Sequence, residues 1–246
     1  MAISSLAEAN RIVILSGAGL STAAGIPDFR GPEGLWTKDP YAELVSTLSW
    51  YLNDEDVRKA AWRRRATPEV WTAKPTKAHE AIVDLEQQGR LRAIITQNTD
   101  GLHQVAGSSD ELVHEVHGSM RQWRCEMCGK TGPMEEMIDR VNAGEEDPRC
   151  PDCGGITRAT VILFEEVLEP DVIEAAINAV EDCDAIVAVG TSLGVYPVAG
   201  LFPTAIGHGA YGVIVNATET AMDHLAHEVV NGQLDDVLPD LLARQA

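Results

Sequence analysis

The chain has 246 residues, of which 19 are Lys or Arg and 38 are Asp or Glu, so the formal net charge is −19. Duplex DNA and anionic membranes would repel such a protein, and we expect neither as a partner. A hydrophobic content of 45% excludes a disordered chain, and the length fits one α/β core with a smaller attached module. The excess of acidic residues is explained by a need for solubility or by adaptation to a cytoplasm with a high salt concentration. Electrostatic attraction of a basic partner is the alternative.

The beginning of the chain has no cationic stretch followed by a long apolar run, and no apolar run is long enough to cross a bilayer. We therefore expect a cytoplasmic protein. Four of the five cysteines form two Cys-x-x-Cys pairs, which in a reducing compartment favours a metal site over disulfides. We expect the fifth, Cys183, to be a small core residue.

Short runs rich in Val, Ile and Ala predict β-strands along the chain. Several are almost continuously apolar, as is typical of parallel strands covered on both faces, and they alternate with helix-like segments such as 77–88 and 171–180. The sequence therefore predicts an α/β fold with a doubly wound, Rossmann-like parallel sheet that binds ligands beyond the carboxyl ends of its strands. The predicted strands are 11–15, 91–96, 112–116, 160–163, 185–189 and 211–215.

Two stretches interrupt this alternation. Residues 31–75 are helix-like and contain Trp, Arg and Pro, whereas residues 121–158 carry both cysteine pairs among many turn residues. We expect these two insertions to form one small domain beside the sheet. The large domain would then be discontinuous and consist of residues 1–30, 76–120 and 159–246.

A glycine-rich turn follows the first predicted strand and reads SGAGLSTAAG at residues 16–25. Such a turn lets backbone N–H groups approach a pyrophosphate at a helix N-terminus. Thr22 stands where the usual dinucleotide fingerprint has its third glycine, so the turn by itself leaves a cofactor site and a plain tight turn equally open.

Polar side chains gather after several predicted strands and turns. GIPDFRG lies at residues 25–31, TQNTDGLH at 96–103 and HGS at 117–119. Together these segments bring an imidazole, two amides, two carboxylates and an arginine to one edge of the predicted sheet. Each residue alone could be a cap, a loop closure or an ordinary loop histidine, but the combination indicates a chemical site.

The two cysteine pairs have the spacing of a tetrahedral Zn(II) site. Four thiolate ligands leave no coordination position for a substrate, so we predict one structural zinc ion. A redox dithiol fits less well, because the glycines that flank the pairs are typical of a zinc ribbon. The predicted ligands are Cys125, Cys128, Cys150 and Cys153.

The order of these motifs resembles that of the sirtuins, the NAD-dependent protein lysine deacylases, of bacterial type. The resemblance spans nearly the whole chain and includes GAGLS at 17–21, GIPDFRG, GLW at 34–36, TQNTDGLH, HGS, both cysteine pairs, GTSLGVYP at 190–197 and VIVN at 213–216. It implies a Rossmann-like NAD-binding domain, a small zinc-containing domain, and deacylation of acylated-lysine proteins or peptides, acetyl-lysine first. The products would be free lysine, nicotinamide and O-acyl-ADP-ribose.

The resemblance also implies roles for single residues. His117 would be the general base acting on a ribose hydroxyl of NAD, which suits an imidazole with an ordinary pKa of about 6.5. Asn98 would be a second catalytic residue that positions the nicotinamide end together with Asp100, and Phe29 would shield the reactive ribose from water. The implied cofactor-binding residues are Gly17, Ala18, Gly19, Ser21, Thr22, Phe29, Arg30, Gln97, Asn98, Thr99, Asp100, Gly190, Thr191, Ser192 and Asn216.

The substrate side departs from the family pattern. In sirtuins the peptide lies as a strand between a segment ending in Phe-Gly-Glu and the segment after the GTS loop, which implies contacts with Ile162, Phe164, Glu165, Gly194 and Val195. The Ile162 carbonyl would accept from the acyl-lysine N–H, and Phe164 would line the acyl tunnel. Glu165 replaces the usual glycine and adds a charge at an edge that receives peptide backbone. We predict that Glu165 favours substrates with Lys or Arg near the acylated residue.

Two alternatives concern the substrate. Sirtuins that prefer acidic acyl groups carry a Tyr-x-x-Arg motif, and the nearest counterpart at residues 62–65, Trp-Arg-Arg-Arg, lacks the tyrosine. This run is more simply predicted to be a solvated helix face, but a preference for acidic or long acyl groups remains an alternative. Mono-ADP-ribosyl transfer at the same site is the second alternative.

Other readings explain less of the sequence. An NAD(P) oxidoreductase would leave PDFRG and HGS without a role, and a non-catalytic NAD sensor or interaction module would not need His117. His224 and His227 stand beside Glu228 like a metal pair, but without a third ligand they predict a solvated helix face.

Overall fold

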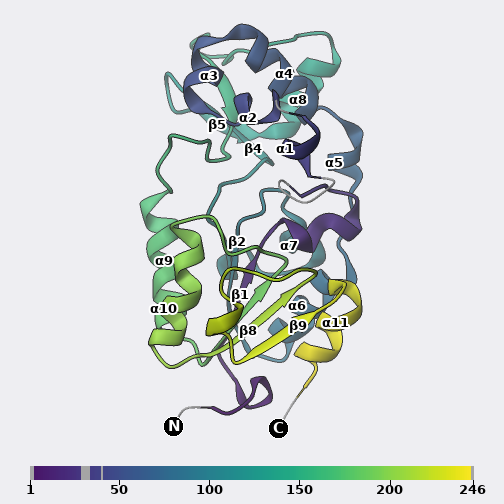
Figure 1. Ribbon diagram of the computed structural model, residues 1–246. Helices are drawn as coiled ribbons and strands as arrows, with labels where there is room; N and C mark the ends of the chain where they lie inside the picture. The colour runs from purple at the N-terminus through teal and green to yellow at the C-terminus, as the bar shows by residue number, and fades with distance from the viewer. Residues whose placement is uncertain (1–2, 29–33, 40, 245–246) are drawn as a thin grey trace.

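The computed structural model describes residues 3–28, 34–39 and 41–244. These residues form two parts, a large one built on a six-stranded sheet and a smaller one with a three-stranded sheet (Figure 1). In the orientation of Figure 1 the smaller part lies above the larger one, and several chain segments connect the two.

The large sheet is entirely parallel and has the strand order β3-β2-β1-β7-β8-β9. This order confirms the predicted doubly wound sheet, in which the chain first builds outward in one direction and then returns to the centre to build the other half. The strands are β1 (Ile12–Ser16), β2 (Leu91–Thr96), β3 (Val113–Glu115), β7 (Ala185–Val189), β8 (Tyr211–Asn216) and β9 (Glu228–Asn231).

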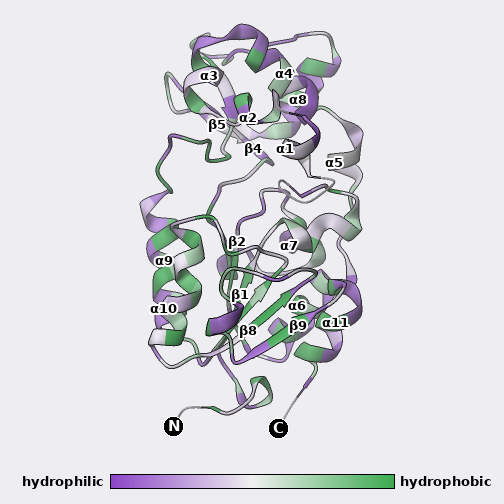
Figure 2. Ribbon diagram, in the orientation of Figure 1, coloured by the Kyte–Doolittle hydropathy of each residue, from purple (hydrophilic) through white to green (hydrophobic). Residues whose placement is uncertain are grey.

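Helices cover both faces of this sheet. Ile12 and Ile14 of β1 pack in a core with α6 (Lys77–Gln87) and α11 (Leu234–Leu242), whereas Val13 and Leu15 pack in a second core with α9 (Pro170–Glu181) and α10 (Leu201–Gly207). Alternate residues of one strand therefore enter opposite cores, which explains why the strand sequence is continuously apolar. Figure 2 shows these strands as a hydrophobic layer between the helices. Cys183 is buried in the second core, as predicted.

The small part combines a zinc-ribbon-like sheet with helices. Its antiparallel strands lie in the order β5 (Thr131–Pro133), β4 (Gln122–Cys125) and β6 (Thr157–Ala159). Helix α8 (Met134–Asn142) directly follows β5 in the chain. Trp62 and Trp123 are fully buried in one core, which joins the helical insertion to this sheet. The exact domain limits stay a prediction. The insertion contains α1 (Leu35–Lys38), α2 (Tyr41–Leu44), α3 (Leu48–Asn53), α4 (Glu55–Arg65) and α5 (Pro68–Thr72).

The predicted strand at 160–163 is wrong. Strand β6 ends at Ala159, and the following N–H groups bond outside the large sheet. Thr160 N donates to the carbonyl of Gln122 at the start of β4 at 3.0 Å, and Ile162 N donates to the His117 carbonyl at 2.9 Å. The apolar residues of this segment therefore connect the two parts of the molecule instead of entering the large sheet.

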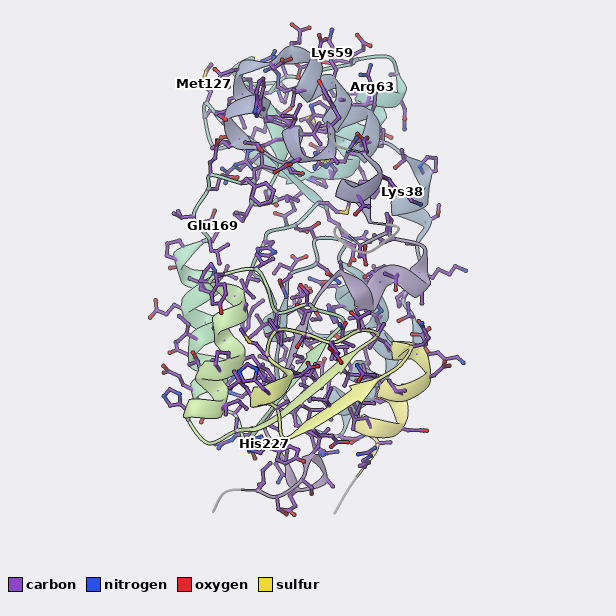
Figure 3. All side chains as sticks on the ribbon, in the orientation of Figure 1. Lys38, Lys59, Arg63, Met127, Glu169 and His227 are labelled. Carbon is purple, nitrogen blue, oxygen red and sulfur yellow. The ribbon has the colours of Figure 1, made fainter. Side chains whose placement is uncertain are left out.

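The predicted helix face around His224 and His227 is also wrong. His224 lies in a short 3-10 turn (Asp223–Leu225), and His227 directly precedes the edge strand β9. The His227 ring stacks on Tyr211 with 4.8 Å between centroids, and its Nδ1 accepts from Gly212 N at 2.9 Å. His227 is labelled at the lower end of the large part in Figure 3, where it supports the sheet edge.

The arginine run at the end of α4 is only partly solvated. Arg63 is exposed on the outer surface of the small part (Figure 3), but Arg64 pairs with Asp39. The Arg65 guanidinium lies 5.9 Å from the centre of the Trp62 ring, and burial lowers the pKa of Arg65. Among the described residues, no helix is long and apolar enough to cross a membrane.

Candidate active site

The loops after β1 and β7 meet through glycines. A Cβ added to Gly17 would lie 2.8 Å from the Thr191 Cβ, and one added to Gly19 would lie 2.8 Å from the Gly190 Cα. Gly19 N also donates to the Gly190 carbonyl at 2.9 Å. These two glycines are therefore required for the contact between two loops at the carboxyl edge of the sheet, whatever ligand binds there.

Asn98, Ser21 and Asp100 form a buried hydrogen-bond network beside this contact. Ser21 Oγ donates to Asp100 Oδ2 at 2.7 Å, and Asn98 Nδ2 donates to Ser21 Oγ at 3.2 Å and to the Gly17 carbonyl at 3.1 Å. Asn98 is 6% exposed and Asp100 7%. Because buried polar groups are costly to leave unpaired, the network fixes the loops after β1 and β2 relative to each other.

Gln97 connects this network to two further loops. Its Nε2 donates to Thr191 Oγ1 at 3.0 Å, and its carbonyl lies 3.2 Å from Nδ1 of His117. The loops that follow β1, β2, β3 and β7 therefore converge at one edge, as the sequence predicts.

His117 is held in one tautomer by this contact. A carbonyl oxygen can only accept a hydrogen bond, so Nδ1 carries the proton and donates to Gln97, and Nε2 keeps a free lone pair. Burial lowers the pKa of His117 below its ordinary 6.5, with the hydrogen bond to Gln97 opposing that shift. At neutral pH the imidazole is therefore uncharged, with Nε2 able to accept a proton.

The segment after β6 touches both the His117 loop and the helical insertion. The Ile162 N–H donates to the His117 carbonyl at 2.9 Å, Phe164 N donates to the Ser46 carbonyl at 2.8 Å, and Leu48 N donates to the Phe164 carbonyl at 3.2 Å. Phe164 is 43% exposed. The predicted substrate segment is thus adjacent to the predicted base.

The two glutamates of this segment have different partners. Glu166 lies between the guanidinium groups of Arg124 and Arg158, and it also accepts from Leu163 N at 2.8 Å. The Glu165 carboxylate accepts two hydrogen bonds from Ser49 of α3. The predicted preference of Glu165 for basic substrates stays a prediction.

The four predicted zinc ligands form one cluster. Their sulfur atoms all lie within 4.8 Å of one another, with 3.5 Å between the Sγ atoms of Cys125 and Cys153 and 3.7 Å between those of Cys128 and Cys150. A Zn(II) ion with four thiolates at about 2.3 Å sets its sulfurs about 3.8 Å apart, so the cluster fits the ion closely. All four thiols are free of disulfides. The geometry leaves no position for a substrate at this metal.

The profile of the Sir2 family matches residues 17–197 of the chain. The chain belongs to the Sir2 family. The match contains the glycine turn, the Asn98 and His117 loops, and both cysteine pairs.

Curated proteins similar to this Sir2-family chain carry deacylase names. "NAD-dependent protein deacetylase 2" of Streptomyces coelicolor is 46% identical over 231 residues, which cover 94% of this chain and 96% of the relative. "NAD-dependent protein deacylase 1" of Archaeoglobus fulgidus is 36% identical over 241 residues, which cover 98% and 95%.

Solved structures give the same result for the fold. A Sir2 enzyme structure has a TM-score of 0.87 at 38% identity and covers 96% of this chain and 92% of its own. A Sir2 histidine-to-alanine variant with a deacetylated p53 peptide and 3′-O-acetyl-ADP-ribose has a TM-score of 0.86 at 34% identity, covering 94% and 92%. The Rossmann-like fold of this Sir2-family chain is therefore established.

Several residues predicted to bind the cofactor or the substrate lie outside the hydrogen-bond network described above. Asn216 ends β8 and donates from Nδ2 to the Thr218 carbonyl at 2.8 Å, while Ser192 and Gly194 are exposed in the loop after β7. Ala18 and Thr22 lie in the 3-10 helix after β1 (Ala18–Ala24), Thr99 follows Asn98, and Val195 follows Gly194. Phe29 and Arg30 lie outside the described residues.

The sequence did not predict the residues that hydrogen-bond to Asp100 or to the end of β2 next to Asn98. Ser16 Oγ donates to Thr96 Oγ1 at 2.9 Å and lies 2.9 Å from Nε2 of the buried His103. Arg121 Nε donates to the Asp100 carbonyl at 2.8 Å. Only glycine at position 101 leaves room for the Arg121 side chain, a close approach that the structure shows and the sequence does not.

Proposed function

We propose that this chain is an NAD-dependent protein lysine deacylase that acts first on acetyl-lysine. The observation that carries the proposal is His117, which the Gln97 carbonyl holds as an Nδ1–H tautomer beside the Asn98–Ser21–Asp100 network. Membership in the Sir2 family and the deacylase names of its relatives support the same activity.

NAD supplies the ribose carbon that receives the acyl oxygen as nicotinamide leaves, so that acyl-lysine, NAD and one water give lysine, nicotinamide and O-acyl-ADP-ribose. The donor set fits this cosubstrate. The buried amide of Asn98 and the carboxylate of Asp100 suit the polar nicotinamide end. The glycine contact brings the loops after β1 and β7 together beside these two residues.

His117 performs the proton transfer. Its Nε2 accepts the proton of a ribose hydroxyl, while Nδ1–H stays bonded to Gln97, which stabilises the imidazolium that forms. A pKa below 6.5 keeps the base deprotonated at neutral pH. Gln97, Thr191, Ser192 and Asn216 hold the ribose, phosphate and adenosine parts. The remaining proposed cofactor contacts are Gly17, Ala18, Gly19, Thr22, Phe29, Arg30, Thr99 and Gly190.

The acyl-lysine lies between two segments. The Ile162 carbonyl accepts from the acyl-lysine N–H, Phe164 lines the acyl tunnel, and Gly194 and Val195 face the peptide from the opposite side. A solved relative at TM-score 0.85 and 31% identity is a Sir2 enzyme bound to a propionylated peptide, which supports a peptide substrate for this chain.

Acetyl-lysine is proposed because the arginine run offers little to an acidic acyl group. Arg64 is paired with Asp39, and Arg65 is packed against Trp62. The zinc ion is proposed to be structural, because all four ligand positions are protein sulfurs. A reducing compartment such as the cytoplasm suits a thiolate cluster of this kind.

Mass spectrometry tests the proposal directly. An acetyl-lysine peptide is incubated with the purified protein, with and without NAD, beside succinyl and long-acyl peptides and a His117→Ala variant. We expect NAD-dependent deacetylation with O-acetyl-ADP-ribose, reduced at least about a hundredfold in the variant. NAD cleavage without deacylation would contradict the proposal and point to ADP-ribosyl transfer.

A further inference from the structure

Glu165 adopts a backbone conformation that is unusual for its residue type. Its φ is 78°, in the left-handed region that favours glycine. Its carboxylate reaches the second residue of α3: one oxygen accepts from Ser49 N at 2.9 Å and the other from Ser49 Oγ at 2.9 Å. The side chain at this position therefore bridges two segments that are 116 residues apart in sequence.

This bridge continues a series of contacts along the same segment. Thr47 and Phe164 form a parallel bridge, with Phe164 bonded through its N–H to Ser46 and through its carbonyl to Leu48. At the other end, the Ile162 N–H is bonded to the His117 carbonyl. Residues 162–165 are thus fixed to the catalytic loop at one end and to the helical insertion at the other.

We propose that Glu165 is a positioning residue that holds the peptide-binding segment 162–164 against α3 through Ser49 and so sets the affinity for the acylated peptide. This inference rests on the proposed function. It differs from a direct contact between Glu165 and substrate charges, because both carboxylate oxygens are directed at Ser49. A charged acceptor with two donors makes a stronger contact than a neutral one, which suits a segment that ends in the exposed Phe164.

A glycine could adopt the same φ without strain, but it would leave Ser49 without this acceptor. In Glu165→Gly, relief of the backbone strain would strengthen peptide binding, whereas loss of the bridge to Ser49 would weaken it. Glu165→Gly therefore distinguishes the two: we expect a higher KM for the peptide. A KM equal to or below that of the wild type would overturn the proposal.

Steady-state kinetics with two substrates gives the main test. For Glu165→Gln, whose amide can accept only through one oxygen, we expect the peptide KM to rise about tenfold while kcat and the KM for NAD change less than about twofold. Ser49→Ala removes one of the two donors and should raise the peptide KM about threefold. Ser49→Thr keeps the hydroxyl and should behave like the wild type.

Glu174→Gln is the matched control, because Glu174 is an exposed carboxylate on α9 and belongs to neither proposed binding set. The double variant Glu165→Gln with Ser49→Ala should be no weaker than Glu165→Gln alone, since both substitutions break the same bridge. Additive effects of the two substitutions would contradict the proposal.

Peptides with acidic and with basic residues beside the acetyl-lysine separate positioning from direct charge contact. Positioning predicts that Glu165→Gln raises KM equally for both peptides. A rise confined to the basic peptide would overturn the inference in favour of a direct contact.

Hydrogen exchange of the free protein gives a readout that does not depend on activity. We expect Glu165→Gln and Ser49→Ala to accelerate exchange at the Leu48 and Phe164 amides, whereas Glu174→Gln should not. Unchanged exchange would overturn the inference even if the wild type deacetylates peptides. Accelerated exchange in a protein that is inactive on every peptide would instead reject the proposed function.

Discussion

The cofactor side of the site and the substrate segment are held by different parts of the molecule. Asn98 and Asp100 are fixed by hydrogen bonds among loops of the large sheet. The segment that contains Phe164 is fixed by the small part, through Ser46, Leu48 and the Glu165 bridge to α3. The two halves of the proposed active site therefore depend largely on different contacts, and the Ile162 N–H joins them at the His117 carbonyl.

The two sides also differ in burial. Asn98 is 6% exposed, whereas Phe164 is 43% exposed. A hydrogen bond lost in a buried network leaves a polar group unpaired, while one lost at the surface is largely replaced by water. Changes on the cofactor side should accordingly cost more than equivalent changes in the substrate segment.

The largest expected effect comes from removing the support of the small part. Cys150→Ser deletes one of four clustered thiols, so we expect zinc loss together with a stability loss of several kcal/mol. Metal analysis and thermal unfolding of the same preparation measure both. A zinc-free variant with unchanged melting would show that the ion does not hold this part together.

A smaller effect is expected on the cofactor side. Ser21→Ala removes the donor to Asp100 and the acceptor for Asn98, leaving both buried groups short of a partner. We expect kcat/KM for NAD to fall about tenfold or more, which corresponds to roughly 1.5–3 kcal/mol. NAD titration at saturating peptide measures this loss, and an unchanged value would mean that the network does not serve the cofactor.

The smallest effect is a shift along the pH axis. His117 is proposed to act as a free base, and burial lowers its pKa, so activity should stay constant near neutral pH and fall only as the pH drops through a value below 6.5. Burial raises the pKa of neighbouring Glu115 to about 7, so a Glu115→Gln variant serves as the control. The acidic limb should persist in that variant, and a limb at or above pH 7 there would contradict the assignment.

Much of this fold could be predicted because burial leaves a clear pattern. Residues 93–95 in β2 and 185–189 in β7 are continuous runs of Val, Ile and Ala, since both faces of these strands enter a core. Strand β9 was missed because it is a short edge strand whose residues alternate between partly buried and exposed, next to two histidines that suggested a helix.

The site was predictable only where residue type determines the role. The cysteine pairs predict a four-sulfur cluster, because ligand chemistry restricts both type and spacing. Arg121 and Ser49 could not be found in this way, because each acts through a partner that is distant in the sequence. Segment 160–163 was predicted as a strand because an apolar run does not reveal which part of the molecule its N–H groups will meet.

The separate support of the two sides is tested most directly by measuring both KM values in Ser21→Ala and in Ser49→Ala. We predict that Ser21→Ala raises the KM for NAD more than the KM for the peptide, whereas Ser49→Ala raises the KM for the peptide and leaves that for NAD within about twofold. If both substitutions raised both constants by the same factor, the two sides would form one cooperative unit and would not be supported separately.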